Sequence, residues 1–168
     1  LQTIRAIYQG RVKRGKMTPE QMEQKLALVT GTTDYNAFSD VDLVIEAVFE
    51  DLEAKKTLFA ELDAACPQAT IFASNTSALS ISAMASATKR PEKVIGLHFF
   101  NPVPIMRLVE VVPGLATSTE TVDDVGAFAE SLRKIPIRVQ ECAGFLVNRL
   151  LMPYLNEAVY TLQEGTAG

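Results

Sequence analysis

Residues 42–77 read DLVIEAVFEDLEAKKTLFAELDAACPQATIFASNTS, and this stretch decides the fold class. It opens with a nearly all-apolar strand at 42–45. A charged, amphipathic helix follows from about residue 52 to residue 65, and Pro67 closes it. The apolar residues 70–73 then predict a second strand. Because a strand, a helix and a strand in this order form a parallel crossover unit, the sequence predicts an α/β fold with a mostly parallel sheet.

The flanking segments continue this alternation of helices and strands. On the N-terminal side we expect a helix that stops at 13–16, a second helix that opens at Thr18-Pro19-Glu20, and a strand at 27–30. On the C-terminal side we expect a short helix from Ser80 to Ala87, strands at 94–99, 108–112 and 135–139, and helices at 119–134 and 144–163. The link between the strands 94–99 and 108–112 is too short for a crossover helix, so these strands should be antiparallel or splayed neighbours.

The composition excludes several classes of partner. Of the 168 residues, 48% are hydrophobic, which suffices for the core of one domain or slightly more. The formal net charge is -4, so we expect neither nucleic acid nor a membrane surface as a partner. The apolar runs are far shorter than the roughly 18 residues of a membrane span, and we expect no signal peptide. Cys66 and Cys142 lie far apart in the sequence and predict free thiols in the cytoplasm, or in the mitochondrial matrix if the source is eukaryotic.

Common functional motifs are absent from the sequence. None of the nine glycines forms Gly-x-Gly, so the chain contains neither the dinucleotide-binding fingerprint nor a phosphate loop. With one histidine and no close pair of cysteines, we predict no metal site. The nucleophile motif Gly-x-Ser-x-Gly is also missing.

His98 is the only histidine and the side chain best suited to proton transfer at neutral pH. A histidine among apolar neighbours is more often a satisfied core residue, and this alternative stays open at the level of the residue alone. If the strands 94–99 and 108–112 are adjacent, however, Glu110 comes level with His98. A carboxylate on one ring nitrogen fixes the tautomer and raises the basicity of the other nitrogen. The pair would then act as a general base.

Other polar side chains follow the predicted strands. Residues 74–77, Ser-Asn-Thr-Ser, lie at a carboxyl edge, where open α/β sheets bind ligands; the alternative is an ordinary turn and helix cap. Glu46 and Glu50 follow the strand 42–45, and by themselves they are better explained as a solvated first helical turn. Asn148 lies within an apolar helix, where its amide needs a partner, and an oxygen of a ligand would serve.

Together these motifs resemble one family. The segments that carry the resemblance are SNTS at 74–77, GLHFFNPVP at 96–104, LVE at 108–110, and GFLVNR at 144–149 with the Pro-Tyr pair at 153–154. In this combination they closely resemble the L-3-hydroxyacyl-CoA dehydrogenases, including the 3-hydroxybutyryl-CoA dehydrogenases and the dehydrogenase part of fatty-acid oxidation complexes. The resemblance runs from about Gly31 to the end of the chain, with a looser similarity before it.

The resemblance implies an NAD-dependent oxidation of (S)-3-hydroxyacyl-CoA to 3-oxoacyl-CoA, as in fatty-acid β-oxidation or butanoate metabolism. In that family His98 is the general acid and base, Glu110 orients it, and Ser77 and Asn148 contact the substrate and its reacting oxygen. The implied cofactor-binding positions are Val48, Phe49, Glu50, Lys55, Asn75, Ser77 and Asn101. Lys55 is also expected to reach the CoA side of the substrate. An acyl-CoA is therefore the expected substrate, and a homodimer is the expected assembly.

The resemblance also implies that the chain is truncated at both ends. We expect a Rossmann-type doubly wound sheet without its first βαβ strands, with residues 1–140 as a partial NAD-binding domain and residues 141–168 as the start of the all-helical substrate and dimerisation domain. The strand 42–45 would then have an open, apolar edge, and the chain alone should bind NAD weakly.

Two other functions remain open at this stage. A catalytically inactive fragment could bind acyl-CoA or serve as an oligomerising module, and the missing phosphate turn favours this alternative. A hydroxyacid or sugar-acid dehydrogenase could also share the segment His-Phe-Phe-Asn-Pro at 98–102. The Asn148-Arg149 pair followed by Pro153 argues for the CoA enzymes.

Overall fold

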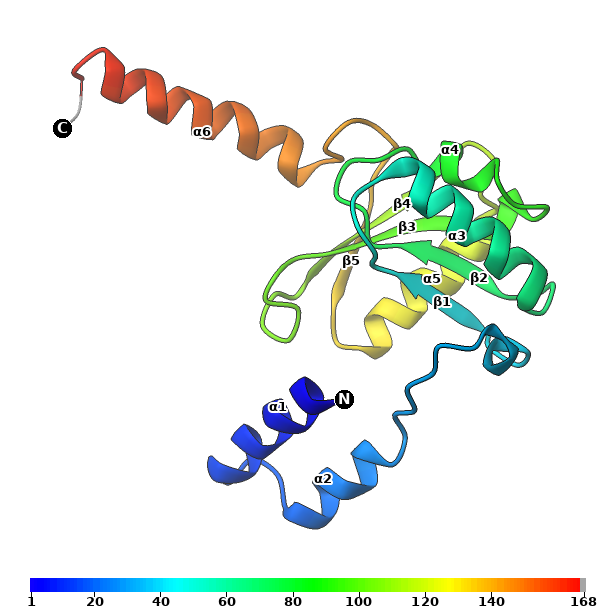
Figure 1. Cartoon of the computed structure of the whole chain (residues 1–168). Coiled ribbons are helices and arrows are strands. Elements are labelled where there is room, and N and C mark those ends of the chain that lie inside the picture. Colours follow the sequence, from blue (N-terminus) through cyan, green and yellow to red (C-terminus); the bar gives the residue numbers. More distant parts are fainter. Residues whose placement is uncertain (167–168) are drawn as a thin grey trace. The chain divides into compact units, whose positions relative to one another are not determined.

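The computed structural model describes residues 1–166 and divides into two units, Leu1–Ala37 and Phe38–Gly168. The first unit holds the helices α1 (Gln2–Lys13) and α2 (Pro19–Leu26), drawn in blue in Figure 1. Thr18 caps α2 by a capping box: its hydroxyl accepts a hydrogen bond from Gln21 N, and the Gln21 side chain accepts one from Thr18 N. Both helices expected from the sequence are confirmed.

The strand expected at 27–30 is wrong. Residues 27 and 28 form a turn at the end of α2, where Leu28 N donates to Lys25 O at 3.3 Å and Val29 N donates to Leu26 O at 3.1 Å. Among residues 1–166, no strand pairs with this segment. An extended segment without a neighbouring strand leaves its backbone groups unpaired, so local β propensity does not suffice to make it a strand.

The second unit contains a five-stranded sheet in the order β1-β2-β3-β4-β5. The strands are β1 (Leu43–Glu46), β2 (Ile71–Ser74), β3 (Val94–Phe99), β4 (Leu108–Pro113) and β5 (Ile135–Arg138). β1, β2 and β3 are parallel, β3 and β4 are antiparallel, and β4 and β5 are parallel. The α/β class and the antiparallel pair are confirmed, and β1 lies at an edge of the sheet as expected.

Helices cover both faces of the sheet. α3 (Leu52–Ala65) and α4 (Ile81–Ala85) lie over one face, and α5 (Thr119–Ser131) lies over the other (Figure 1). The core is accordingly divided in two. On the side of α3 and α4 the buried apolar residues include Phe59, Leu62, Phe72, Ile81, Met84, Val94, Val112 and Phe145. On the side of α5 they include Ile71, Ala73, Ile95, Leu97, Val109, Val111, Val122, Val125 and Ala129. Alternate strand residues thus enter opposite clusters.

Left-handed residues set two helix boundaries that differ from the sequence prediction. α5 ends at Ser131 rather than at residue 134, because Arg133 has φ 60° and the chain turns there. α6 (Val147–Gln163) begins three residues later than expected, because Gly144 and Phe145 have φ 73° and 48°. Neither conformation belongs to a right-handed helix.

α6 exposes most of its apolar side chains. Leu150, Tyr154, Val159 and Leu162 are each more than 60% exposed. Within the described part of the chain, no helix combines the length and the apolar character that a bilayer crossing requires. The helix therefore presents an unpartnered apolar surface in the single chain.

The contact between α4 and the sheet yields a stability prediction. A methyl group at Gly96 of β3 would lie 2.9 Å from Ile81 Cδ1 and 3.0 Å from Val112 Cβ, so the Gly96→Ala variant is overpacked. We expect a loss of about 2 kcal/mol in the free energy of unfolding, measured by urea denaturation followed by circular dichroism. The control is Gly126→Ala in α5, where nothing lies within 4 Å of the added carbon and a gain of about 0.5 kcal/mol is expected. Equal stability of the two variants would contradict this packing.

Candidate active site

His98 and Glu110 lie opposite each other on the antiparallel strands β3 and β4. Directly paired residues point to the same face of a sheet, and here it is the face that α4 covers. His98 Nδ1 lies 2.7 Å from Glu110 Oε2, and both side chains are buried. The expectation that Glu110 comes level with His98 is therefore confirmed.

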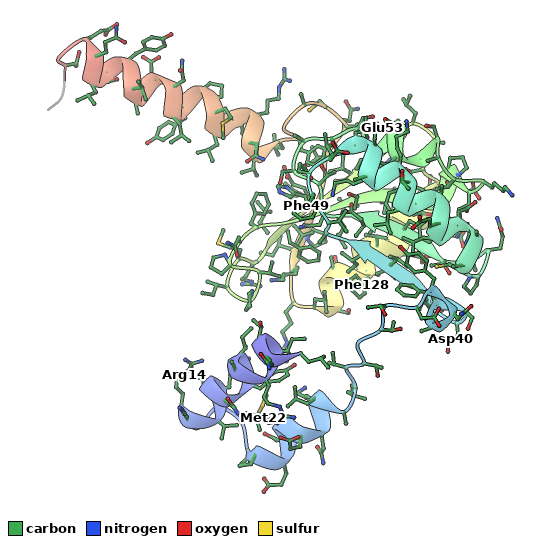
Figure 2. The ribbon with its side chains drawn as sticks, viewed as in Figure 1. Arg14, Met22, Asp40, Phe49, Glu53 and Phe128 are labelled. Carbon is green, nitrogen blue, oxygen red and sulfur yellow. The ribbon has the colours of Figure 1, made fainter. Side chains whose placement is uncertain are left out.

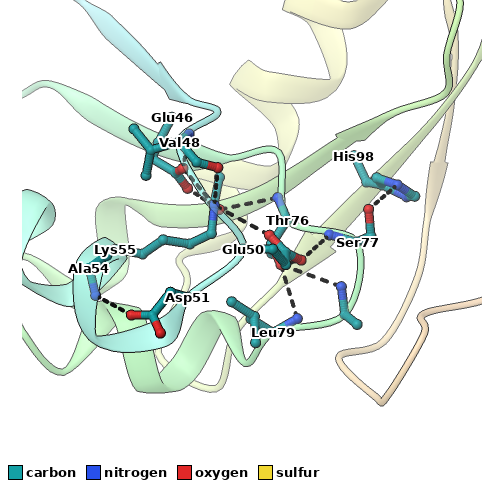
Figure 3. Close-up of polar contacts among 12 residues, drawn as sticks. Glu46, Val48, Glu50, Asp51, Ala54, Lys55, Thr76, Ser77, Leu79 and His98 are labelled. Atoms are coloured by element: carbon teal, nitrogen blue, oxygen red, sulfur yellow. Dashed lines mark hydrogen bonds and ion pairs between the residues drawn. The ribbon is translucent and has the colours of Figure 1, made fainter.

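The partners of the imidazole ring determine its tautomer. A carboxylate accepts hydrogen bonds, so Nδ1 carries the proton and donates it to Glu110. The unprotonated Nε2 lies 3.2 Å from Ser77 Oγ, which can donate to it (Figure 3). The lone pair of Nε2 consequently faces the polar loop that follows β2, where a ligand hydroxyl could replace the Ser77 hydroxyl as donor.

The second oxygen of Glu110 is bound by the chain at the start of α6. Leu146 N donates to Glu110 Oε1 at 3.0 Å, and Val147 N donates to the same atom at 2.9 Å. A buried carboxylate is costly unless its oxygens are partnered, and the Glu110 carboxylate has three donors. Both oxygens of the buried carboxylate beside the imidazole are therefore satisfied.

A buried ion pair lies at the carboxyl ends of β1 and β2. Lys55 Nζ of α3 lies 2.6 Å from Glu46 Oε1, and the lysine is only 1% exposed. Ser74 Oγ donates to Glu46 Oε2 at 2.6 Å, and Val48 N donates to Oε1 at the same distance. Glu46 therefore belongs to the strand and to a buried network, and its interpretation as part of a solvated helical turn is wrong.

Glu50 connects this ion pair to the loop that carries Ser77. Its Oε1 accepts hydrogen bonds from Thr76 Oγ1 at 2.5 Å and from Ser77 N at 2.9 Å, and its Oε2 lies 3.4 Å from Lys55 Nζ (Figure 3). Burial, the largest single influence, raises the pKa of Glu50. The hydrogen bonds and the ammonium charge outweigh it, so the pKa lies below the ordinary value of 4.5. An ionised Glu50 holds the backbone of Ser77 in place.

The three asparagines expected in the site differ in their placement. Asn75 Oδ1 accepts from Phe99 N at 2.8 Å, which ties the loop after β2 to the end of β3. Asn148 Nδ2 lies 3.5 Å from Ser77 O. Asn101 is exposed in the stretch after β3. The structure thus brings Asn75 and Asn148 to the loop beside His98, while Asn101 is not joined to them by a hydrogen bond.

A second polar cluster, which the sequence did not predict, supports the loop 139–146. Glu141 accepts hydrogen bonds from the hydroxyls of Ser80 and Ser82 and from Ser82 N, and so caps the start of α4. Burial raises the pKa of Glu141, but these hydrogen bonds together lower it below 4.5. No signal in the sequence links residues 59 or more positions apart in this way. Only the Ser80 cap of α4 was predictable, and it is confirmed.

A hollow of about 480 Å³ lies elsewhere in the second unit. It is lined by Asp42, Thr70 and Phe128, among others, at the amino ends of β1 and β2. His98 and Ser77 belong to the opposite end of the parallel strands, where α/β folds bind their ligands. The candidate site is therefore identified by its side chains and not by the position of the hollow.

Most of the chain is similar to one known protein family. Residues 1–142 match the family described as "3-hydroxyacyl-CoA dehydrogenase, NAD binding domain". The chain belongs to this family. The similarity of the segments around His98 and Glu110 to hydroxyacyl-CoA dehydrogenases is thereby confirmed at the level of the family.

Several relatives of the 3-hydroxyacyl-CoA dehydrogenase family are similar over most of the chain. A 3-hydroxybutyryl-CoA dehydrogenase from Clostridioides difficile is 49% identical over 156 residues, which are 93% of this chain and 56% of the relative. The crystal structure of the Ralstonia eutropha (S)-3-hydroxybutyryl-CoA dehydrogenase is 40% identical with a TM-score of 0.95, covering 99% of this chain and 59% of that one. The Escherichia coli K12 enzyme is 48% identical with a TM-score of 0.95, covering 99% and 35%. The chain therefore spans between about a third and three fifths of the length of these relatives.

The residues of this chain fit one part of NAD, the cofactor of the family. Val48 and Phe49 follow β1 and expose apolar side chains beside the network of Glu46 and Glu50, and Figure 2 shows Phe49 at the surface. Asn75 and Ser77 add polar groups at the same edge of the sheet. The sequence contains no Gly-x-Gly turn of the kind that binds the pyrophosphate. In residues 1–166, no group of three or more potential ligands is arranged to hold a metal ion.

The lowered pKa of Glu50 yields a pH prediction. Its ionised form stabilises the fold above pH 4.5, and this contribution is lost as the pH falls through the lower pKa of the folded state. The parent chain should therefore be more stable than the Glu50→Gln variant at pH 7, and the difference should shrink below pH 4.5. Urea midpoints measured from pH 7 to pH 3 test this. Glu53→Gln, which alters an exposed carboxylate of α3, is the control. A Glu50→Gln curve parallel to that of the parent would contradict a stabilising role for the hydrogen bonds of Glu50.

Proposed function

We propose that this chain forms the proton-transfer site and the nicotinamide side of an NAD-dependent (S)-3-hydroxyacyl-CoA dehydrogenase. The observation that carries the proposal is the buried pair of His98 and Glu110, in which Nδ1 is bound by the carboxylate and Nε2 faces the Ser77 hydroxyl. The family to which the chain belongs supports the same reaction.

His98 acts as the general base in the direction of oxidation. The C3 hydroxyl of the substrate takes a place within hydrogen-bond reach of Nε2 and Ser77 Oγ, and Nε2 accepts its proton as the C–O bond becomes a carbonyl. Glu110 stabilises the resulting imidazolium through Nδ1–H and stays ionised, because two backbone amides hold its other oxygen. In reduction the imidazolium returns the proton to the oxygen.

A bound NAD would supply the acceptor for the hydride that leaves the carbon bearing the hydroxyl group. The alcohol thus loses two electrons and two hydrogens, one as hydride and one as the proton on His98, and the ketone is the product. Ser77 and Asn148 orient the reacting oxygen, and the fixed backbone of Ser77 makes this orientation reproducible. Glu50 and Lys55 contribute from the cofactor side, although the ammonium of Lys55 is buried in this structure.

The proposed substrate is a short-chain 3-hydroxyacyl-CoA of fatty-acid β-oxidation or butanoate metabolism. The Clostridioides difficile, Ralstonia eutropha and Escherichia coli relatives are all named 3-hydroxybutyryl-CoA dehydrogenases, which favours a four-carbon acyl group. Cys66 and Cys142 are both free thiols, which supports a reducing compartment such as the cytoplasm or the mitochondrial matrix.

We further propose that the chain forms a homodimer through α6. The exposed apolar residues of this helix support the proposal, since such a surface is rarely left in water. The same surface is the observation that favours the second candidate function, an inactive oligomerising or acyl-CoA-binding module. Sedimentation of the chain as a stable monomer would contradict the dimer.

A hybrid enzyme tests the catalytic function. The 156 matched residues of the Clostridioides difficile relative are replaced by those of this chain, and oxidation of NADH with acetoacetyl-CoA is followed. We expect activity in the hybrid and a loss of about 10³-fold in kcat in its His98→Gln variant, because proton transfer contributes about this much. The control is Lys56→Gln, which alters a partly exposed lysine of α3. A folded hybrid without activity, or a His98→Gln variant within threefold of it, would contradict the proposal.

A further inference from the structure

Phe145 is a buried residue that the proposed reaction does not use. It has a left-handed backbone conformation, with φ 48°, and its side chain is 1% exposed. Such a conformation is uncommon and unfavourable for a residue other than glycine, asparagine or aspartate. The surrounding structure must therefore impose it, and residues of this kind gather at functional sites.

The ring of Phe145 packs against the imidazole of His98. The two ring centroids are 5.8 Å apart and the rings meet edge to face at 62°. Phe100 lies closer, at 4.7 Å and 57°. With Glu110 on Nδ1, these contacts restrict the rotation of the imidazole, so that Nε2 keeps its direction.

The backbone of Phe145 determines where the next two amides point. Phe145 N donates to Cys142 O at 3.0 Å, which closes a tight turn through Gly144. The left-handed pair of Gly144 and Phe145 then reverses the chain just before α6. As a result, Leu146 N and Val147 N both aim at Glu110 Oε1. With a right-handed backbone at Gly144 and Phe145, the two amides would point elsewhere and could not both donate to Glu110 Oε1.

Core packing alone does not account for this arrangement. Phe145 belongs to the buried cluster on the side of α3 and α4, but an apolar residue can fill a core from a relaxed backbone. Here the unfavourable φ angle places two backbone amides on one carboxylate, and the side chain adds one aromatic contact to the imidazole. Both partners of the proton-transfer pair thus depend on a single residue.

We propose that Phe145 is a positioning residue of the reaction, which fixes His98 through its ring and Glu110 through its backbone turn. The proposal rests on the proposed function of the pair. The first amides of α6 bind Glu110, so the start of this helix and the geometry of the base are coupled. Gly144 is required for the same turn. A residue with a Cβ atom at this position would place that atom 3.3 Å from Arg149 N and would have to adopt a φ of 73°.

Nitrogen NMR of the whole chain tests the proposal without turnover. The chain has one histidine, so ring-¹⁵N-labelled histidine gives the signals of His98 alone. In the parent we expect a protonated Nδ1 with slow exchange and an unprotonated Nε2. Gly144→Ala should accelerate the exchange of the Nδ1 proton at least tenfold and mix the tautomers. Phe145→Leu, which keeps the apolar volume, should also accelerate it.

Two further variants separate the turn from general strain. Gly15→Ala has the same left-handed strain, with φ 66°, and no atom within 4 Å of the added carbon, so it should give the parent signals. Gly144→Asn adds the same Cβ atom as Gly144→Ala but tolerates a left-handed backbone, and it should lie closer to the parent. In the hybrid enzyme, Gly144→Ala should lower kcat at least tenfold and leave KM for acetoacetyl-CoA within threefold.

The outcomes distinguish this proposal from the proposed function. If Gly144→Ala and Phe145→Leu stay folded and both give the signals of the parent, Phe145 only fills the core and the inference is wrong. If one of them does not fold, the other decides by the same criterion. A parent chain with a protonated Nε2 would instead contradict the base assigned to His98, whatever the variants show.

Discussion

The Glu110 carboxylate is the group on which the site depends. It is buried in the middle of β4, where a charge without partners would destabilise the fold by several kcal/mol. One oxygen is bound by His98 and the other by the two amides at the start of α6, so both oxygens are partnered. The same three contacts join two strands of the sheet to the next helix. The hydrogen bonds that orient His98 for proton transfer therefore also hold β3, β4 and the start of α6 together.

The second buried charge, on Lys55, serves a different purpose. It is balanced by Glu46 and, at a longer distance, by Glu50, and these carboxylates bind Ser74, Thr76 and the backbone of Ser77. Charge balance at the end of β1 thus reaches the loop that faces Nε2 of His98. Each strand end contributes one part of this arrangement, and the parallel order of β1, β2 and β3 brings the parts together.

Much of this could be predicted from the sequence where the signal was local. Of the six strands expected from apolar runs, five are confirmed. The expected adjacency of the strands 94–99 and 108–112 predicted that Glu110 would come level with His98. The strand predicted at 27–30 is wrong, because a strand needs a neighbouring strand to pair with and local propensity does not provide one. The burial of Glu46 and of Arg90 was not predictable either. Arg90 binds Asp63 at 2.7 Å across 27 residues, and Lys55 reaches Glu46 only through the crossover of α3. The left-handed φ of Phe145 has no signal of its own, since only the neighbouring Gly144 hints at a turn.

The site depends on where the proton between Glu110 and His98 resides, and the hydrogen bonds of the carboxylate place it on Nδ1. Neutron diffraction from a deuterium-exchanged crystal of the chain at pH 8 locates that proton directly. The account predicts nuclear density for a deuteron on His98 Nδ1, directed at Glu110 Oε2, and none on Nε2. A deuteron on Nε2 with the two side chains apart, or one on Glu110, would contradict the account, because no lone pair would then be held ready for a substrate hydroxyl.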